Sequence, residues 1–207
     1  MTTYKLKTRF QAMLRFATAG LAAMGVTANQ VTVGASAISI GIGAVVALNA
    51  TNPLYFWLIP VWLFIRMALN AIDGLLARDF GQKSPLGAYL NELCDVVSDA
   101  ALYLPFALVA PFQPAWVAVV IFLAAMAEFA GALGPMVGAS RRYEGPMGKS
   151  DRALVFGGLG LAIALLAPLP AWTAWIMPAI ALLLCATIVN RVRGALHQLR
   201  RIPRLRR

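Results

Sequence analysis

Long stretches without a charged residue constrain the fold of this chain more than any other feature of its sequence. Residues 31–50, 100–127 and 153–190 contain no Asp, Glu, Lys or Arg. A helix needs about 20 predominantly apolar residues to cross a bilayer, so each stretch can hold at least one such helix. With 60% apolar and 13% charged residues, the chain can neither cover a water-soluble surface nor stay disordered. The sequence therefore predicts an all-α, polytopic membrane protein.

Prolines divide these stretches into helices of membrane-spanning length. Pro168 and Pro170 interrupt the longest stretch, and Pro111 and Pro114 mark a second break. A break is expected there because proline removes a backbone donor and disrupts a helix interior. The prediction is six transmembrane helices, at roughly residues 31–50, 53–79, 85–111, 114–139, 152–168 and 170–193.

Basic residues fall on alternate connections between these helices. The connections at 50–53, 111–114 and 168–171 carry no Lys or Arg, whereas the other two and both chain ends are basic. Because Lys and Arg collect in cytoplasmic loops, we expect a multi-pass protein of the inner (cytoplasmic) membrane with both termini in the cytoplasm. Attraction to anionic membrane lipids accounts for the net charge of +10, so no nucleic-acid partner is expected. An interfacial aromatic belt is also expected, comprising Tyr55, Trp57, Trp62, Trp116, Trp172 and Trp175.

The first 25 residues allow two interpretations. Leu6, Phe10, Leu14 and Leu21 recur at helical spacing among basic residues, which is typical of an amphipathic helix lying at the membrane interface. A cleavable signal peptide is the alternative, because a basic start precedes an apolar segment. We favour the interfacial helix, which gives three parts: 1–25 as a juxtamembrane helix, 26–196 as the membrane domain and 197–207 as a basic cytoplasmic tail.

Five acidic residues lie at or near membrane depth, where a charge is costly and usually functional. With one histidine and two cysteines, the chain offers no zinc spacing and no disulfide framework. Oxygen ligands favour Mg²⁺, Mn²⁺ or Ca²⁺, and bound Mg²⁺ is commonly shared with substrate phosphates. Structural ion pairs with Arg66 or Arg78 are the alternative. The five residues are Asp73, Glu92, Asp95, Asp99 and Glu128.

The stretch from Asn70 to Asp95 resembles a known signature. The CDP-alcohol phosphotransferases, or phosphatidyltransferases, share the pattern D-x2-D-G-x2-A-R-x8-G-x3-D-x3-D. Its spacing is kept throughout this chain, and asparagine replaces aspartate at the first and third acidic positions, Asn70 and Asn91. The matching residues are Asp73, Gly74, Ala77, Arg78, Gly87 and Asp95.

This resemblance implies an enzyme of phospholipid biosynthesis. It would move a phosphatidyl-type group from a CDP-linked lipid such as CDP-diacylglycerol to an alcohol acceptor and release CMP. One or two Mg²⁺ or Mn²⁺ ions and a homodimer are implied as well. Asp95 matches the family's general base, and Asp73 is the second catalytic carboxylate. Implied metal ligands are Asn70, Asp73, Asn91 and Asp95, with Glu92 (or Asp99) restoring charge; implied nucleotide-side residues are Gly74, Ala77, Arg78, Gly87, Asn29, Thr32 and Ser84.

Four basic residues occupy the connection between the fourth and fifth predicted spans. They either mark the cytoplasmic side or bind an acceptor phosphate or lipid headgroup, and Glu128 either contacts the acceptor or pairs with a buried arginine. Gly148-Lys149-Ser150 lacks the first glycine and preceding strand of a P-loop. The candidate acceptor-binding residues are Arg141, Arg142, Lys149 and Arg152.

Two other functions remain open at this point. A small cation-coupled transporter could use the same carboxylates, but these cluster at one end of the spans and no inverted repeat is visible. A non-catalytic relative that binds lipid or nucleotide would explain Asn70 and Asn91. The sequence does not identify the acceptor alcohol.

Overall fold

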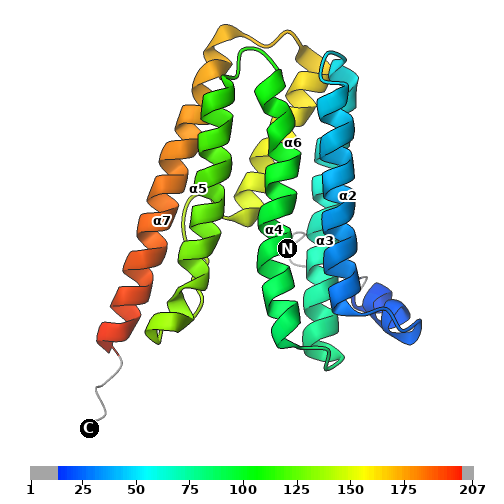
Figure 1. Ribbon diagram of the computed structural model, residues 1–207, viewed down its shortest axis with the longest axis vertical. Coiled ribbons are helices and arrows are strands. Elements are labelled where there is room, and N and C mark those ends of the chain that lie inside the picture. The colour runs from blue at the N-terminus through cyan, green and yellow to red at the C-terminus, as the bar shows by residue number, and fades with distance from the viewer. Residues whose placement is uncertain (1–13, 202–207) are drawn as a thin grey trace, which may run out of the picture.

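The computed structural model describes residues 14–201, and every regular element in this range is helical (Figure 1). A short helix, Leu14–Ala23, precedes the long ones. The long helices are α2 (Ala28–Leu48), α3 (Leu58–Asp79), α4 (Pro85–Tyr103), α5 (Pro114–Ala132), α6 (Lys149–Leu166) and α7 (Ile176–Arg201). Short 3₁₀ helices lie in the connections: η1 (Pro53–Trp57), η2 (Leu104–Leu108), η3 (Gly134–Val137) and η4 (Ala171–Trp175).

Local sequence explains where the first helices begin. Thr27 and Gln30 form a capping box at the start of α2, in which each side chain accepts a hydrogen bond from the other residue's backbone N–H. Ser84 caps α4 by accepting a hydrogen bond from the Gly87 N–H at 2.9 Å, and Pro85 follows at the first helical position. These caps fix the ends of α2 and α4 that lie beside the site.

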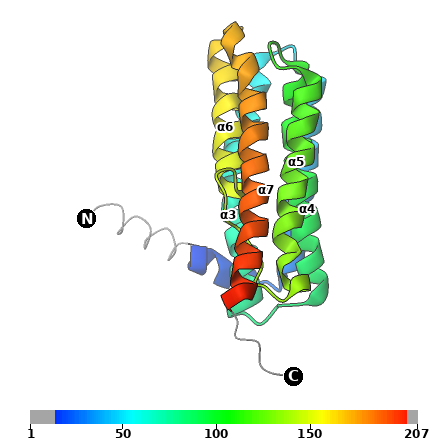
Figure 2. The ribbon, with the colours of Figure 1, turned by 90° about the vertical axis from the view of Figure 1, so that its left-hand side faces the viewer.

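The long helices form an up-and-down bundle. Helix α2 packs against both α3 and α4, α5 packs against α7, and α6 packs on α3. Figures 1 and 2 show that α2 begins and α7 ends at the same end of the bundle, the lower end in both views. The α3–α4 connection lies at this end too, and the α5–α6 connection starts there and rises to the start of α6, so alternate connections begin on one side.

Buried aromatic rings close the opposite end. Phe56, Phe106 and Phe156 are fully buried, and the centroid of the Phe106 ring lies 5.5 Å from that of Phe56 and 5.2 Å from that of Phe156 in edge-on contacts. Tyr103 stacks on Phe156. Edge-on and stacked contacts of this kind stabilise a core beyond simple area burial. The bundle is therefore tightly packed at the end opposite the start of α2.

Glycines allow two close helix approaches. A side chain at Gly43 of α2 would overlap the backbone carbonyl of Ala101 in α4, and one at Gly160 of α6 would lie 3.1 Å from the Phe56 carbonyl. Gly157 also faces its own chain, at Pro60, whereas Gly158 has open space around it. Gly157 and Gly160 therefore pack inside the protomer.

The all-helical, membrane-type prediction is confirmed for residues 14–201. Four helical segments are long and apolar enough to cross a membrane: Ala28–Leu48, Pro53–Asp79, Pro114–Val137 and Ala171–Arg200. Helices α4 and α6 lie within the same bundle but each carries three charged residues, so the count of six spans stays a prediction. Counted together with the short 3₁₀ helices that flank them, the helices begin and end within about three residues of the expected bounds, except that α7 continues past residue 193 to Arg201.

The predictions of an N-terminal amphipathic helix and of an interfacial aromatic belt agree with the structure only in part. Leu6 and Phe10 of the N-terminal amphipathic helix lie outside the described residues, as does most of the basic tail. The described helix Leu14–Ala23 places Leu14 against α3, in a cluster with Ile72 and Leu76. Trp62 departs from the predicted aromatic belt, because it is buried and donates a hydrogen bond from Nε1 to Ser39 Oγ at 2.8 Å.

Candidate active site

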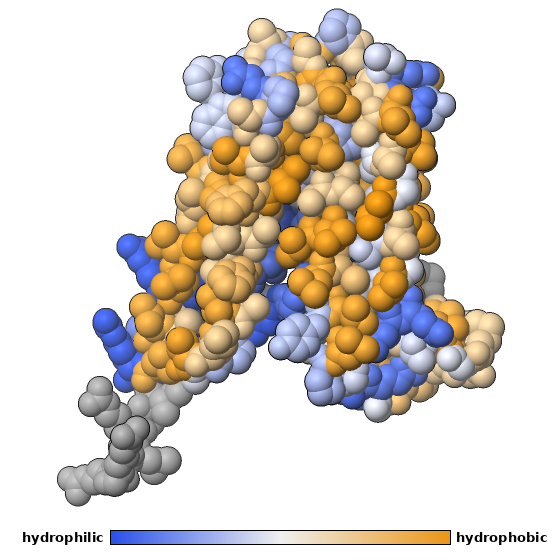
Figure 3. Space-filling model, in the orientation of Figure 1, coloured by the Kyte–Doolittle hydropathy of each residue, from blue (hydrophilic) through white to orange (hydrophobic). Residues whose placement is uncertain are grey.

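A cavity of about 890 Å³ opens at the lower end of the bundle. Figure 3 shows this region as a polar hollow between two apolar flanks. One wall comes from α2, α3 and α4, and the other from the start of α6 and the connection between α5 and α6. The predicted residues that line it are Asn29, Thr32, Asn70, Asp73, Gly74, Ala77, Arg78, Ser84, Gly87, Asn91, Glu92, Asp95, Arg141 and Lys149.

Asp73 and Asp95 reach this cavity from neighbouring antiparallel helices. Both are largely buried, at 6% and 9% exposure. Asp73 Oδ2 lies 2.7 Å from the Thr32 hydroxyl, which donates to it and is also 3.0 Å from the Ala28 carbonyl oxygen. Asp95 Oδ1 accepts from Arg66 Nη2 at 3.1 Å, and its Oδ2 contacts the ammonium group of Lys149. The two carboxylates therefore have different partners, a neutral hydroxyl for Asp73 and two cations for Asp95.

Small residues shape the wall formed by α2, α3 and α4. A side chain on Gly87 would meet Asn29 Oδ1 at 2.8 Å and Ser84 Oγ at 3.0 Å, so glycine lets Asn29 lie directly on α4. A side chain on Gly74 would meet Arg78 Nη1 at 3.1 Å. Gly74 thus leaves room for the Arg78 guanidinium to fold back along α3 beside the cavity, where it can bind phosphate oxygens.

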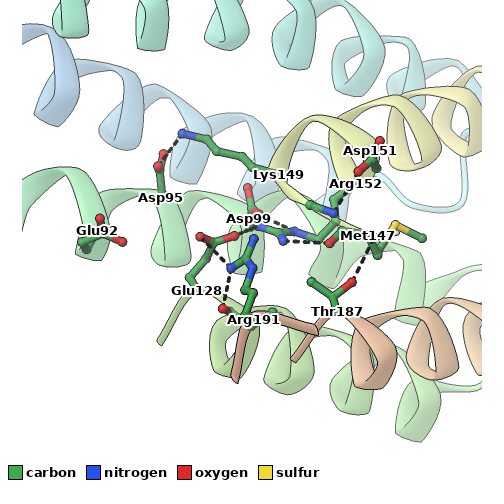
Figure 4. Close-up of polar contacts among 12 residues, drawn as sticks. Glu92, Asp95, Asp99, Glu128, Met147, Lys149, Asp151, Arg152, Thr187 and Arg191 are labelled. Atoms are coloured by element: carbon green, nitrogen blue, oxygen red, sulfur yellow. Dashed lines mark hydrogen bonds and ion pairs between the residues drawn. The ribbon is translucent and has the colours of Figure 1, made fainter. Parts of the chain in front are cut away.

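A network of buried ion pairs supports the inner end of the site (Figure 4). Arg66 of α3 bonds Asp99 of α4 at 2.5 Å. Arg152 of α6 bonds both Asp99 and Glu128 at 2.9 Å, and Arg191 of α7 lies 3.4 Å from Glu128. Buried charges are tolerated when they are paired and hydrogen-bonded in this way. The network joins five helices and pairs Glu128 with buried arginines, while Glu128 also lines the cavity.

The connection between α5 and α6 is held against its neighbours by backbone contacts. The Arg142 N–H donates to the Gly131 carbonyl at 3.1 Å, and the Met147 N–H donates to Thr187 Oγ1 at 3.0 Å. A side chain on Gly131 would meet the Arg142 carbonyl at 2.5 Å, so glycine is needed for this approach. The anchored backbone decides which basic side chains can reach the cavity.

Two of the four predicted acceptor-binding residues do not line the cavity. Arg141 points inward and bonds Glu92 at 2.6 Å, but the neighbouring Arg142 points away and pairs with Glu144 and Gln198. Desolvation raises the pKa of the Glu144 carboxyl, but backbone hydrogen bonds and Arg142 outweigh it, so this pKa lies below its usual value. Arg152 is 1% exposed and belongs to the buried ion-pair network. The prediction that Arg142 and Arg152 face the acceptor therefore differs from the structure.

Two arginines at the site carry roles that were not predicted from the sequence. Arg66 was considered as an ion-pair partner only, but it donates to both the side chain and the carbonyl oxygen of Asp95. Arg191, near the basic end of the chain, is buried and lines the cavity. The sequence could have indicated the role of Arg66 at Asp95, because an arginine within an apolar span is rare and usually functional.

The residues at the site can bind a divalent cation, although they include few negative charges. Asp73 and Asp95 offer carboxylate oxygens, and Asn70 and Asn91 line the same cavity with amide oxygens, which are suitable hard ligands. Glu92 also lines the cavity, but Arg141 engages it. Asp99 is committed to Arg66 and Arg152 and does not reach the cavity. Across residues 14–201 no group of three or more Asp, Glu, His and Cys side chains is arranged to hold a metal ion.

An apolar helical bundle with carboxylates, amides and guanidinium groups at one open end defines a class of membrane-embedded transferases for phosphorylated substrates. Residues 25–196 match the sequence profile of the family described as CDP-alcohol phosphatidyltransferase. The chain belongs to this family and is a CDP-alcohol phosphotransferase. The resemblance seen in the motif from Asn70 to Asp95 is thereby confirmed at the level of the family.

Relatives extend over most of the chain. Inner membrane protein YnbA of Escherichia coli is 44% identical over 199 residues, covering 95% of this chain and 97% of that protein. Archaetidylinositol phosphate synthase of Aeropyrum pernix is 29% identical over 161 residues, covering 75% of this chain and 80% of the synthase.

Solved structures share the fold. Mycobacterium tuberculosis phosphatidylinositol phosphate synthase PgsA1, crystallised with manganese and citrate, aligns with a TM-score of 0.72 and 20% identity over 92% of both chains. The same enzyme with CDP-DAG bound aligns with a TM-score of 0.70 over 95% of this chain and 98% of the enzyme. At this identity the likeness concerns the fold.

Proposed function

We propose that this chain transfers a phosphatidyl-type group from a CDP-linked lipid to an alcohol acceptor and releases CMP, as a step of phospholipid biosynthesis. One observation carries the proposal. The motif residues between Asn70 and Asp95, together with Asn29 and Thr32 from α2, line a single cavity at one end of an apolar bundle. That arrangement lets the nucleotide lie in water while lipid chains remain beside the helices. The catalytic domain is proposed to span residues 26–196.

The proposed donor side lies along α3 and the start of α4. Gly74 and Ala77 lack bulky side chains and let the nucleotide approach the backbone of α3 closely, and Arg78 binds diphosphate oxygens. Asn29, Ser84 and Gly87 form the neighbouring surface for the nucleotide. A bound Mg²⁺ or Mn²⁺ would neutralise the diphosphate and polarise it for attack; the residues proposed to hold it are Asn70, Asp73, Asn91 and Asp95.

Asp95 is proposed to accept the proton of the acceptor hydroxyl, since a carboxylate within reach of that proton is what the step requires. Arg66 fixes its orientation through two hydrogen bonds. Arg141 and Lys149 on the opposite wall are proposed to face an anionic group of the acceptor. Glu92 would position Arg141 for this role and is proposed as a supplementary source of negative charge for the cation.

The proposed cellular arrangement follows the charges. Six membrane spans with both termini in the cytoplasm would place the cavity at the cytoplasmic face of the inner membrane, because the basic connections and the cavity lie at the same end of the bundle. The 44% sequence identity to an inner membrane protein of Escherichia coli supports this placement. A homodimer is proposed from the family alone.

CMP release tests the proposal. Purified protein in detergent or vesicles would be given CDP-diacylglycerol, Mn²⁺ and single alcohols from a panel that includes glycerol 3-phosphate, inositol phosphate, serine and inositol. We expect CMP release that depends on both the acceptor and the cation. Equal, background release with every acceptor would contradict the transferase proposal.

A second candidate function rests on Asn70, Asn91 and the contact between Lys149 and Asp95. These features lower the negative charge of the site, as expected of a relative that binds a CDP-linked lipid without turning it over. Binding of CDP-diacylglycerol without CMP release, across the acceptor panel, would favour this function.

A further inference from the structure

The two carboxylates of the proposed cation site differ in their partners. Asp73 accepts a hydrogen bond from the neutral Thr32 hydroxyl. Asp95 has a cation at each oxygen, because Arg66 bonds Oδ1 at 3.1 Å and the Lys149 ammonium contacts Oδ2. An approaching divalent cation would therefore meet an unneutralised carboxylate at Asp73 and a neutralised one at Asp95.

Formal charge limits how many cations the site can hold. The pattern that the motif follows has four aspartates, whose four negative charges balance two divalent cations. Here Asn70 and Asn91 leave two motif carboxylates, Asp73 and Asp95, which balance one, and the charge of Glu92 at the same cavity is offset by Arg141. Amide oxygens can still coordinate a cation but do not offset its charge, and two divalent ions about 4 Å apart repel strongly unless carboxylates lie between them.

Lys149 places a positive charge beside Asp95 and Asn70, in the cavity proposed to hold the cation. It is the first residue of α6 and lines the cavity together with Asn70, Asp73 and Asp95. It also lines a second, smaller cavity of about 230 Å³ between α3 and α6, which Asn70 and Arg66 line as well. The ammonium group thus stands at Asp95, beside the position where asparagine has replaced the first aspartate of the pattern.

We propose that this site holds one divalent cation, with Asp73 as its carboxylate ligand, and that the Lys149 ammonium takes the place of a second cation at Asp95. The inference rests on the proposed function, since it concerns the cation of the same site. It relates Lys149 to the two asparagines of the motif: two negative charges are lost, and one fixed positive charge replaces a diffusible divalent one.

The number of Mn²⁺ ions bound per chain tests the inference independently of catalysis. Equilibrium dialysis of the purified protein in detergent, with and without CMP, gives the stoichiometry, and the electron paramagnetic resonance spectrum reports coupling between two nearby Mn²⁺ ions. We expect one Mn²⁺ per wild-type chain and no coupled spectrum. Two bound ions, or none, would overturn the inference.

A pair of triple variants isolates Lys149. Asn70→Asp/Asn91→Asp/Lys149→Gln restores four aspartates and removes the ammonium group, and should bind two Mn²⁺ with a coupled spectrum. Asn70→Asp/Asn91→Asp/Lys83→Gln has the same change in net charge, and Lys83 lines the same cavity without an ion pair to Asp95 among the described residues. We expect its second Mn²⁺ to bind at least about 10-fold more weakly. Equal affinities for the second ion in the two variants would refute the role of Lys149.

Single variants keep the inference testable if a triple variant does not fold. Lys149→Gln alone frees Asp95, so it should bind Mn²⁺ at least about 10-fold more tightly than the wild type, whereas Lys83→Gln should change that affinity by less than about 3-fold. Equal Mn²⁺ affinities in the two variants would count against the inference. The proposed function fails separately: one bound Mn²⁺ without CMP release from any acceptor would uphold the cation inference and overturn the transferase reaction, and two bound ions with CMP release would do the reverse.

Discussion

Asp73 shows at the scale of single residues how much the proposed chemistry depends on one carboxylate. Its motif neighbour one turn earlier is Asn70, which cannot supply charge, and its nearest partner is the Thr32 hydroxyl. We predict that Asp73→Asn lowers Mn²⁺-dependent CMP release by at least about 100-fold, because loss of a direct ligand should exceed the 10–100-fold effect of residues that support ligands. Thr32→Val, which leaves the carboxylate in place, should have a smaller effect. Full CMP release by Asp73→Asn, or by wild-type protein in excess EDTA, would contradict the cation role.

Arg66 combines a structural and a positioning role in one side chain. It is 3% exposed and donates to Asp95 and Asp99. We predict that Arg66→Met destabilises the protein by about 3–5 kcal/mol, because removing one partner leaves buried carboxylates uncompensated. Thermal unfolding in detergent would measure this, with Arg193→Met as the control, since Arg193 lies exposed on α7. Similar unfolding temperatures for the two variants would show that Arg66 is not needed for folding.

Arg66→Lys separates positioning from stability. Lysine keeps the positive charge but lacks the planar fork that holds Asp95 and Asp99 together. We therefore expect most of the stability to return, while the pH dependence of CMP release shifts because Asp95 is oriented differently. An unchanged pH profile would leave Arg66 with a structural role alone.

At the scale of helices, one glycine sets the distance between α2 and α4. A side chain at Gly43 would overlap the Ala101 carbonyl, whereas one at Gly41, on the same helix, would meet nothing within 4 Å. We predict that Gly43→Ala destabilises the protein by about 1–3 kcal/mol through overpacking. Gly41→Ala should be neutral or stabilising by up to about 1 kcal/mol, since alanine favours helix. Thermal unfolding of the pair would test this, and equal effects would mean that the two helices can shift apart freely.

The α5–α6 connection distinguishes two adjacent arginines. Arg141 faces the cavity, whereas Arg142 pairs with Glu144 outside it. For an anionic acceptor, we predict that Arg141→Ala raises the acceptor KM by at least about 10-fold, because a charge-assisted hydrogen bond is lost. Arg142→Ala should change that KM by less than about 3-fold. Both KM values come from CMP release at varied acceptor concentration. A larger effect at Arg142 would mean that Arg141 does not bind the acceptor and only marks the cytoplasmic side of the protein.

For the whole molecule, the bundle predicts which connections share a side of the membrane. The α3–α4 connection, the start of α2 and the end of α7 lie at the cavity end, and the α2–α3 connection lies opposite (Figure 1). In a background with Cys94 and Cys185 replaced by alanine, we predict that Lys83→Cys reacts with an impermeant maleimide in inside-out vesicles. Thr51→Cys should react in right-side-out vesicles. Labelling of both positions from the same side would refute the six-span topology.

The sequence by itself determined the helical class, the approximate helix bounds and the motif residues. Uncharged stretches and prolines are local features, and a motif with fixed spacing on two helices joined by a short turn must converge at one end of them. Thr32 and Asn29 could be assigned from resemblance alone, because nothing in the sequence fixes how α2 lies against α3 and α4.

Only the tertiary structure decided which charges face each other. Arg141 and Arg142 look alike in the sequence, yet Arg141 lines the cavity and pairs with Glu92, whereas Arg142 pairs with Glu144 outside it. Arg66 lies outside the motif, seven residues before Asp73, and Arg152 lies 53 residues beyond Asp99, yet both pair with the same carboxylate. Long-range pairing of this kind depends on the rotation and spacing of whole helices. Those are set by side-chain packing and by close approaches such as that at Gly43, which no local pattern encodes.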